Sequence, residues 1–309
     1  MALKYSESKH PYIDLGNGFQ ITFFEDRCKH GEDFESKARR AINETPENVP
    51  KAMAELRRLV VADGRFNIPY ESDWYINTYL RSGSYDPQET YNILQATGTQ
   101  KSKNREYFGS VASIRHVFEE GLVWVVPERD EDGAVIIVVE SGKKWNPAKV
   151  SVVQLNTAVN AVISIFLNSV EAQLHGYKLI FDMDGLSMKQ IVQFTPQTTA
   201  IMLDLMDRCS CIRLLQVHTV NNGMVYNMVV SIMKPLMSKS MREKQIFHGR
   251  NMASLAKFIS PKVLPPKYGG TSKAPPYDGR LLGDLLLHYD EWMLKMHNYG
   301  FKRKNSKGE

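Results

Sequence analysis

The nine residues LIFDMDGLS (179–187) decide how this chain folds, because an apolar run ends there in two acids and a glycine. Together with the preceding residues 177 and 178, the run predicts a buried strand that leaves its sheet at Asp182. The carboxylate of Asp182 would accept hydrogen bonds from the following backbone amides, and Gly185 would supply the turn. The stretch therefore predicts the carboxyl end of a strand inside a larger sheet.

Strands and helices alternate on both sides of this stretch. Apolar runs predict strands over 121–126, 134–141, 177–182, 212–220 and 243–249, and helical spacing predicts helices over 150–174, 195–209, 221–237 and 251–259. This alternation predicts an α/β fold in which helices flank a mixed, largely parallel sheet. The spacing of apolar residues from 46 to 104 predicts a small all-helical region before the sheet.

Composition places the chain among folded globular proteins. Its 309 residues are 43% hydrophobic and 24% charged, and the net charge of +5 permits an anionic partner without naming one. Cys28, Cys209 and Cys211 form neither an even disulfide framework nor a zinc-binding spacing. The amino terminus lacks an apolar signal core, and polar amides interrupt the most apolar stretch, 150–170. We expect a cytoplasmic monomer without a nucleic-acid partner.

Asp182 and Asp184 also resemble the first motif of haloacid-dehalogenase-type phosphatases, in which the first Asp attacks phosphorus beside Mg²⁺. The threonine that usually follows Asp-x-Asp-Gly is Leu186 here, which removes one phosphate donor. The acidic segment GDLLLHYD (283–290) follows a Pro-rich loop and not a strand. His175 and His218 each lack an acid or base at usable spacing and are interpreted as structural. We therefore expect no catalytic residue, no metal site and no cofactor.

Residues 121–270 as a set resemble the CRAL-TRIO (Sec14-like) lipid-binding domain, most closely the branch of the alpha-tocopherol transfer protein, the cellular retinaldehyde-binding protein and the clavesins. The segments that carry the resemblance are WNP (145–147), VEAQLHGYKLIFDMDGL (170–186), FTPQTTAIMLDLMDRC (194–209), QVHTVNNGMVYNMVVSIMKPLM (216–237), HGRN (248–251) and LPPKYGG (264–270). Their order and spacing are specific, although each segment alone would be weak.

The resemblance implies three parts of the chain. Residues 1–107 would hold an amino-terminal segment and a small helical domain, in which YLRSGSYDPQ (79–88) resembles a family motif. Residues 108–275 would form the lipid-binding domain, and 276–309 a carboxyl-terminal amphipathic helix with a basic tail. The family's second arginine in the helical motif is Gly83 here, so only Arg81 remains.

A lipid carrier needs an apolar cavity between its sheet and its helices. Taken together, the family's pocket positions and the uncharged helix predicted over 150–174 give the following expected ligand-binding residues: Asn156, Val159, Asn160, Ile163, Phe166, Tyr177, Phe181, Met202, Leu205 and Met206. Core packing alone would also explain the apolar row of the helix. The amides at Asn156, Asn160 and Asn168 need partners, which cavity waters or a ligand hydroxyl could provide. Two positions that carry serine in the tocopherol-binding branch are Val159 and Ile163 here, which argues against tocopherol itself.

In the family, the segment 221–237 is a lid over the pocket, flanked by a patch that binds phosphoinositide headgroups. The expected lid residues are Val225, Met228, Val229, Ile232, Met233 and Leu236. The expected headgroup-binding residues are Arg213, Lys239, Arg242 and Lys244. Ser240 replaces one family lysine, and a solvated basic turn is the alternative interpretation of this patch.

The resulting hypothesis is a carrier, not an enzyme, that lies peripherally on membranes. It would bind one small hydrophobic ligand of isoprenoid type, such as a retinoid, tocopherol, terpenoid or carotenoid, and exchange it at phosphoinositide-containing membranes. A phospholipid ligand also stays open. The alternative is a lipid-responsive scaffold without transfer activity.

Overall fold

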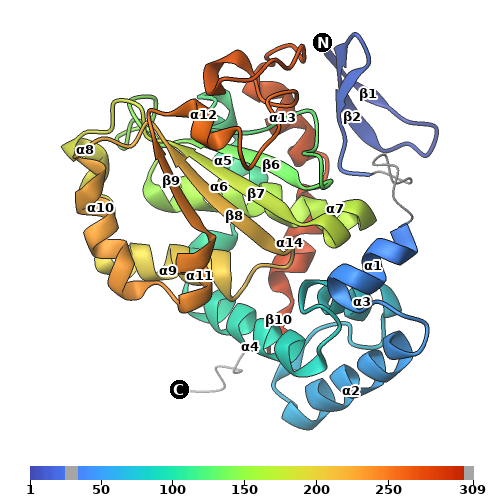
Figure 1. Cartoon of the computed structure of the whole chain (residues 1–309). Coiled ribbons are helices and arrows are strands. Elements are labelled where there is room, and N and C mark those ends of the chain that lie inside the picture. The colour runs from blue at the N-terminus through green and yellow to red at the C-terminus, as the bar shows by residue number, and fades with distance from the viewer. Residues whose placement is uncertain (25–33, 303–309) are drawn as a thin grey trace.

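A five-stranded sheet lies at the centre of the molecule, as a computed structural model shows (Figure 1). The structure describes residues 1–24 and 34–302. The strands follow in the order β5 (Val123–Val125), β6 (Val135–Glu140), β7 (Tyr177–Asp182), β8 (Leu214–Val220) and β9 (Gln245–Gly249). β5 pairs antiparallel with β6, and the other three pairings are parallel. The mixed, largely parallel sheet predicted from the sequence is therefore confirmed.

The connecting helices of the parallel strands gather on one face of the sheet. Each connection advances by one strand in the same direction, and right-handed crossovers in that order place their helices on a common face. These elements are α6 (Val152–Ile165), η2 (Phe166–Asn168), α7 (Val170–His175), α8 (Met188–Ile191), α9 (Pro196–Asp207), α10 (Tyr226–Met233), η3 (Lys234–Leu236) and α11 (Lys239–Lys244). The other face is covered by α12 (Met252–Leu255) and the segment that ends in η4 (Pro266–Tyr268).

Side chains on each strand alternate between these two faces. On β6, Val135, Ile137 and Val139 pack with the crossover helices, whereas Ile136 and Val138 pack with the α12 side. All five side chains are buried. Burial on both faces explains why the strand reads as a continuous apolar run.

The single long helix predicted over 150–174 is wrong. α6 begins at Ser151, whose side chain forms a capping box with Gln154, and ends at Ile165. A 3₁₀ turn follows, and Ser169 caps the separate helix α7 by accepting a hydrogen bond from the Ala172 amide at 3.1 Å. A serine that caps a new helix competes with continuation of the old one.

The segment between β8 and β9 also differs from the prediction. α10 begins at Tyr226 and not at residue 221, because Asn221 adopts a positive φ of 56° and the chain turns before the helix. Ser238 then caps the unpredicted helix α11 by accepting from the Met241 amide at 2.9 Å. The strand predicted from residue 243 therefore starts only at Gln245.

The amino-terminal part combines helices with a sheet that the sequence analysis missed. The predicted helical region contains α1 (Phe34–Ile42), α2 (Asn48–Asp63), α3 (Asp73–Ser82) and α4 (Pro87–Lys103). Before it, β1 (Ala2–Tyr5), β2 (Pro11–Gly16) and β3 (Phe19–Ile21) form a three-stranded antiparallel sheet. This small sheet contacts α13 (Gly279–Leu287). Cys28 lies outside the described residues.

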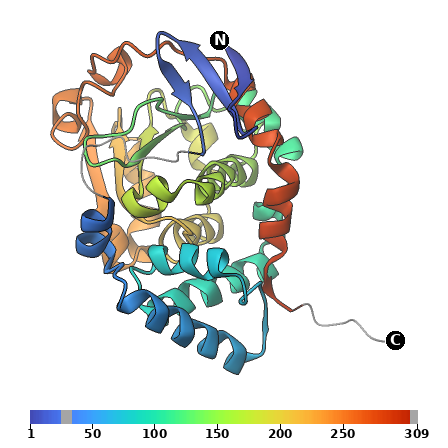
Figure 2. The same cartoon turned by 90° about the vertical axis from the view of Figure 1, so that its right-hand side faces the viewer.

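The carboxyl-terminal segment runs along one side of the molecule from this small sheet to the helical region (Figure 2). It contains α13, α14 (Asp290–Asn298) and β10 (Gly300–Phe301), and β10 pairs antiparallel with β4 (Phe66–Asn67). Between helical region and sheet lie η1 (Arg105–Phe108) and α5 (Val111–Glu119), and α5 contacts α13. The domain boundaries expected at residues 107 and 275 stay a prediction. Across the described part of the chain, every helix is too short or too polar to cross a bilayer.

Candidate ligand-binding site

An apolar cavity lies between the sheet and α6, α9 and α10. It extends to the carboxyl ends of β6 and β7, where Ser141 and Met183 follow the strands. Its other lining residues are Val139, Val152, Leu155, Asn156, Val159, Phe181, Phe194, Met202, Met206, Val217, Tyr226, Val229, Met233 and Gln245. None of these residues carries a charge, so the cavity offers no partner to an ionised ligand.

The cavity is almost filled by its own side chains. Its volume is about 30 Å³, whereas pockets for drug-sized ligands measure roughly 300–1,000 Å³. Four of the lining residues are methionines: Met183, Met202, Met206 and Met233. Methionine has three rotatable bonds and repacks more readily than branched residues. Part of the wall is thus built from side chains that repack readily.

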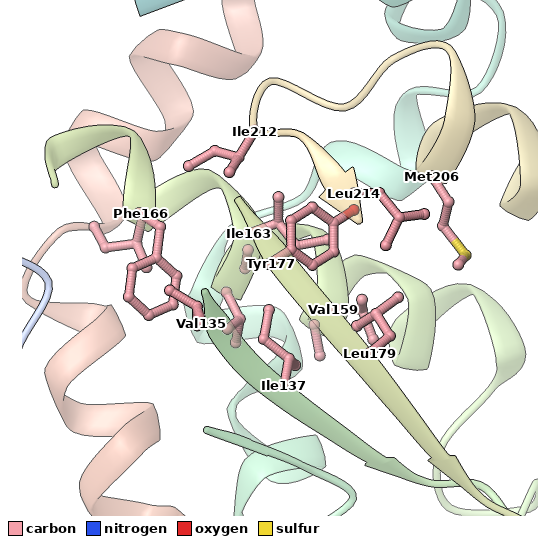
Figure 3. Packing of buried hydrophobic residues seen from close by; sticks show 14 of the residues in the cluster. Val135, Ile137, Val159, Ile163, Phe166, Tyr177, Leu179, Met206, Ile212 and Leu214 are labelled. Carbon is pink, nitrogen blue, oxygen red and sulfur yellow. The ribbon is translucent and has the colours of Figure 1, made fainter. Parts of the chain in front are cut away.

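The structure divides the ten expected ligand-binding residues into two groups and two outliers. Asn156, Val159, Phe181, Met202 and Met206 line the cavity. Ile163, Phe166 and Tyr177 meet Val135 and Ile212 near the amino ends of the strands, in close packing without free volume. Figure 3 shows these side chains continuing the row that begins at Val159 and Met206.

Leu205 and Asn160 do not line the cavity. Leu205 packs with Tyr107 and Cys209 in a separate cluster, because it is one residue away from the inward-facing Met206 on α9. The Nδ2 atom of Asn160 is buried without a hydrogen-bond partner in the described structure. Asn156 already donates to the Val152 carbonyl at 2.9 Å. Asn168 donates to the Ile165 carbonyl at 3.1 Å. The expected polar row therefore gives one bonded amide in the cavity, and one bonded and one unbonded amide outside it.

Sequence reasoning missed Gln245, one of the polar residues that line the cavity. It is the first residue of β9, and its Nε2 atom is buried with no hydrogen-bond partner in the described chain. An unpaired buried amide costs roughly 1–3 kcal/mol. A ligand hydroxyl or carbonyl would relieve that cost. Its sequence neighbours EKQIFHG gave no signal for this position, because the preceding helix α11 was not recognised.

Helix α10 has an inner and an outer apolar face. Val229 and Met233 are buried and line the cavity, together with Tyr226. Val225, Met228 and Leu236 are exposed by 41%, 47% and 40%. Ile232 is half-buried. Of the six expected lid residues, two therefore contact the cavity and three face solvent.

The exposed apolar surface continues beyond α10. Met224 precedes the helix, and Met188 and Val192 belong to or follow α8, which contacts α10. We name Met188, Val192, Met224, Val225 and Met228 the outer lid patch. Contiguous apolar surface of this kind marks an interaction or membrane site more often than single exposed residues do.

The four expected headgroup-binding cations do not form one cluster of free charges. Lys239 and Arg242 are exposed on α11, and Arg242 donates to the Lys234 carbonyl at 3.1 Å. Lys244 lies 3.8 Å from the Asp207 carboxylate. Arg213 points inward and donates to the Leu174 carbonyl, and burial lowers the pKa of its guanidinium. Lys239 and Arg242 are therefore the two cations of this set that face solvent.

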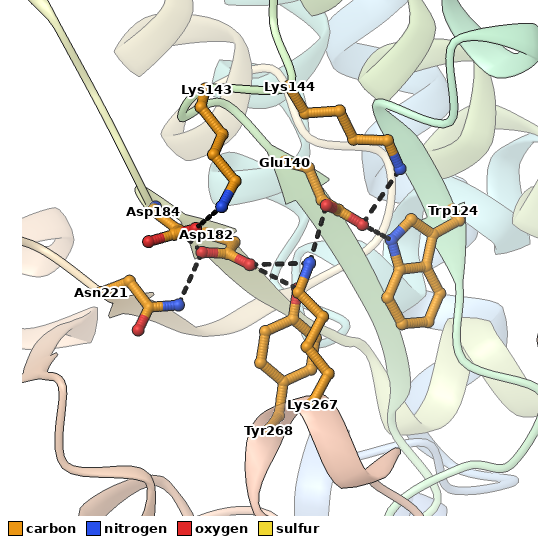
Figure 4. A network of polar contacts seen from close by, with 9 residues as sticks. All are labelled: Trp124, Glu140, Lys143, Lys144, Asp182, Asp184, Asn221, Lys267 and Tyr268. Carbon is orange, nitrogen blue, oxygen red and sulfur yellow. Dashed lines mark hydrogen bonds and ion pairs between the residues drawn. The ribbon is translucent and has the colours of Figure 1, made fainter.

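The two acids of the opening stretch are held by protein groups (Figure 4). Asp182 accepts hydrogen bonds from Asn221 at 2.8 Å and from Tyr268 at 3.0 Å, and it pairs with Lys267 at 2.9 Å. Burial alone would raise the pKa of Asp182, but the bonds from Asn221 and Lys267 outweigh it and lower the pKa. Asp184 pairs with Lys143 at 2.6 Å. These carboxylates join the strand ends to the segments before α10 and after α12.

This network accounts for the acids without phosphatase chemistry. Both carboxylate oxygens of Asp182 have protein partners, so this residue has a structural role. Within residues 1–24 and 34–302, no group of three or more His, Cys, Asp or Glu side chains could hold a metal ion. His218 lies in a buried pair with His248, 3.0 Å between ring nitrogens, and His175 lies 3.2 Å from Glu171.

Comparison with known proteins finds similarities in sequence and in structure. Residues 119–270 match the family model described as the CRAL/TRIO domain. Clavesin-1 of Xenopus laevis is 25% identical over 246 residues, which cover 78% of this chain and 73% of the relative. Clavesin-2 of Homo sapiens is 24% identical over 261 residues, covering 82% and 79%. A crystal structure of Sfh5 aligns with a TM-score of 0.42 at 10% identity, over 81% of this chain and 96% of that chain.

The matched residues contain the whole five-stranded sheet, the crossover helices and the cavity between them. They end at Gly270, directly after the segment that supplies Lys267 and Tyr268 to the Asp182 network. The resemblance inferred from the sequence is thereby confirmed. Residues 119–270 therefore form a CRAL-TRIO domain, and members of this family bind and transfer lipids.

Proposed function

We propose that this protein is a carrier, not an enzyme, that holds one small neutral hydrophobic ligand between its sheet and α6, α9 and α10. The observation that carries the proposal is the uncharged cavity closed by the inner face of α10. A ligand that replaced water around these walls would gain roughly 25 cal/mol per Å² of apolar surface buried. The absence of charge among the lining residues favours a neutral ligand.

The ligand would displace methionine side chains and move α10 outward, because a volume of about 30 Å³ cannot hold it otherwise. Val159, Phe181, Met202 and Met206 would contact it first. Longer ligands of isoprenoid type would extend along the row towards Ile163, Phe166 and Tyr177. The unpaired Gln245 amide favours a ligand with one hydroxyl or carbonyl group.

Exchange would take place at a membrane surface, where the protein would bind peripherally from the cytoplasm. The outer lid patch would enter the lipid, and Lys239 and Arg242 would meet anionic headgroups such as phosphoinositides. Moving α10 exposes its inner face, and this costs less free energy against lipid than against water. The membrane would therefore promote opening.

The test is ligand transfer between two vesicle populations, followed by fluorescence of a retinoid or terpenoid probe. Val225→Glu places a charge in the outer lid patch, and we expect transfer to fall at least about tenfold, since a charge is costly in lipid. Val61→Glu is the matched control, because Val61 is 57% exposed on α2, far from α10 (Figure 1). Equal transfer by both variants and the unmodified protein would contradict the lid mechanism.

The alternative, a lipid-responsive scaffold without transfer, is favoured by one observation, the closed cavity of about 30 Å³. A scaffold would not need to open for exchange. It would bind vesicles without moving the probe between them. Membrane binding without transfer would therefore support the scaffold and reject the carrier.

A further inference from the structure

A second, larger cleft lies away from the lipid cavity, where the end of α4 meets η1, α14 and β10. Its volume is about 630 Å³, within the range of ligand pockets. It is bounded by segments almost two hundred residues apart, because β10 pairs with β4 beside α4. We name it the α4–β10 cleft. None of the residues expected to bind headgroups near α10 lines it.

Four cations line the α4–β10 cleft: Arg65, Lys101, Arg105 and Lys302. In the described part of the chain, no acidic residue lines it. Arg65 is the only one of the four with an ion pair among the described residues, to Asp63 at 2.8 Å, and it also lies 4.8 Å above the Phe301 ring. The cleft therefore has an excess of positive charge.

Lys101 is the innermost of these cations. Its ammonium donates to the Met296 and Tyr299 carbonyls at 2.7 and 2.9 Å, which leaves one of its three N–H groups. Burial lowers the pKa of Lys101 to about 8, since the charge lies in a poorly solvated place without a carboxylate. An anion in the cleft would compensate that charge directly.

Arg105 and Lys302 are exposed at the rim, and among the described residues neither has a hydrogen-bond or ion-pair partner through its side chain. An unpaired guanidinium and an unpaired ammonium in one cleft are the groups that proteins use for phosphate. Phe108 and Phe301 supply apolar walls next to them.

His297 lies where its pKa would report the binding of an anion in the cleft. It lines the cleft edge-on to Phe108, with ring centroids 5.7 Å apart, and its ring nitrogens are buried without a partner at hydrogen-bond geometry in the described structure. Burial, and then the charge of Lys101, lower the pKa of His297 to about 4. A bound anion would raise that pKa, because it would offset the charge of Lys101.

We propose that the α4–β10 cleft binds a ligand that carries several phosphate groups. Its volume and its uncompensated cations together fit a polyphosphorylated group better than a single small anion. The same chemistry occurs in a phosphorylated lipid headgroup and in a soluble inositol phosphate. The proposal is independent of the carrier function, because the cleft and the apolar cavity share no lining residue.

The test is calorimetric titration of the full chain with inositol hexakisphosphate at fixed salt. The double variant Arg105→Glu, Lys302→Glu should bind at least about tenfold more weakly, since both charge-assisted contacts are reversed. The matched control Lys51→Glu, Lys262→Glu changes the net charge equally at two exposed positions outside the cleft, and it should bind like the unmodified protein. Circular dichroism checks that both variants fold.

A parallel sedimentation assay separates the two sources of phosphate. It uses phosphatidylcholine vesicles with and without phosphatidylinositol bisphosphate. Cleft-dependent binding to the vesicles identifies a lipid headgroup, and cleft-dependent binding to the soluble probe alone identifies a free metabolite. In either case the proton resonances of His297 should titrate at higher pH when the ligand is bound. The proposal is overturned if both double variants lose binding equally, or if neither probe binds.

Discussion

The two faces of the central sheet differ in how many buried methionines pack against them. The face under α12 packs branched and aromatic residues: Ile136, Val138, Ile180, Val220, Leu255, Ile259, Leu264 and Tyr268, all buried. The face under α6, α9 and α10 includes Met183, Met202, Met206 and Met233 around its cavity. Branched side chains have few rotamers, whereas methionine adapts to irregular space.

A network of ion pairs and hydrogen bonds reinforces the α12 face. Lys267 bridges Glu140 and Asp182 at 2.7 and 2.9 Å, and Tyr268 bonds to the same Asp182 (Figure 4). The cavity face instead keeps the unpaired amide of Gln245. If the protein is the carrier that we propose, the ligand would enter by movement of the helices on the methionine side, while the other face holds the sheet in place.

The largest expected effect comes from equal truncations on the two faces. Ile180→Ala should lower the free energy of unfolding by about 4 kcal/mol, because its rigid surroundings cannot close the space left behind. Met202→Ala should cost about 2 kcal/mol, since neighbouring methionines can fill the space. Urea unfolding of both variants measures the difference. Equal losses in the free energy of unfolding would contradict the claim that the α12 face is the more rigid of the two.

The second expected effect is a loss of stability at acidic pH, caused by two buried histidines on the α12 face. Burial, then the charges of His248 and Lys178, lower the pKa of His218 to about 3, and burial also lowers that of His248. The unfolded chain takes up these protons near pH 6.5, so the stabilisation is complete above that value and is lost as the pH falls towards 3.

We expect a loss of about 1.4 kcal/mol per pH unit from His218 within that window, and the lowered pKa of His248 adds to the loss in the same direction. Urea unfolding at pH 7.0, 6.0 and 5.0 measures the slope. His218→Gln should flatten it, and His116→Gln on α5, outside this pair, is the control that should not. An unchanged slope in His218→Gln would show that other groups cause the acid sensitivity.

The smallest expected effect concerns Gln245. Gln245→Leu removes an unpaired buried amide and should raise the free energy of unfolding by about 1 kcal/mol in ligand-free protein. With a hydroxyl- or carbonyl-bearing ligand bound, the same change should weaken affinity. Urea unfolding without and with the ligand measures both the gain in stability and the loss of affinity. A destabilised ligand-free variant would mean that the amide already has a stabilising role.

The sequence predicted the sheet well, because burial on both faces produces continuous apolar runs such as 134–141. It failed where local capping competes with helix continuation, as at Ser169 and Ser238. The missed amino-terminal sheet did carry a signal. Asn17 and Gly18, both at positive φ, form the Asn-Gly turn that is typical of a hairpin.

The site was predictable only in part. The family resemblance identified α9 as a cavity wall but did not separate the inward Met206 from Leu205, because both are apolar neighbours. Gln245 lines the cavity because β9 pairs with β8. A local sequence pattern does not show which strands pair. The α4–β10 cleft is formed by segments that are distant in the sequence, so a local motif could not predict it.

Native mass spectrometry of the purified protein, followed by solvent extraction and identification of what is released, tests the central claim most directly. The account predicts one neutral apolar molecule per chain, or its uptake when retinoid, tocopherol or terpenoid probes are added. Protein that is purified without a ligand and binds none of these probes would contradict the claim that the methionine-lined cavity opens.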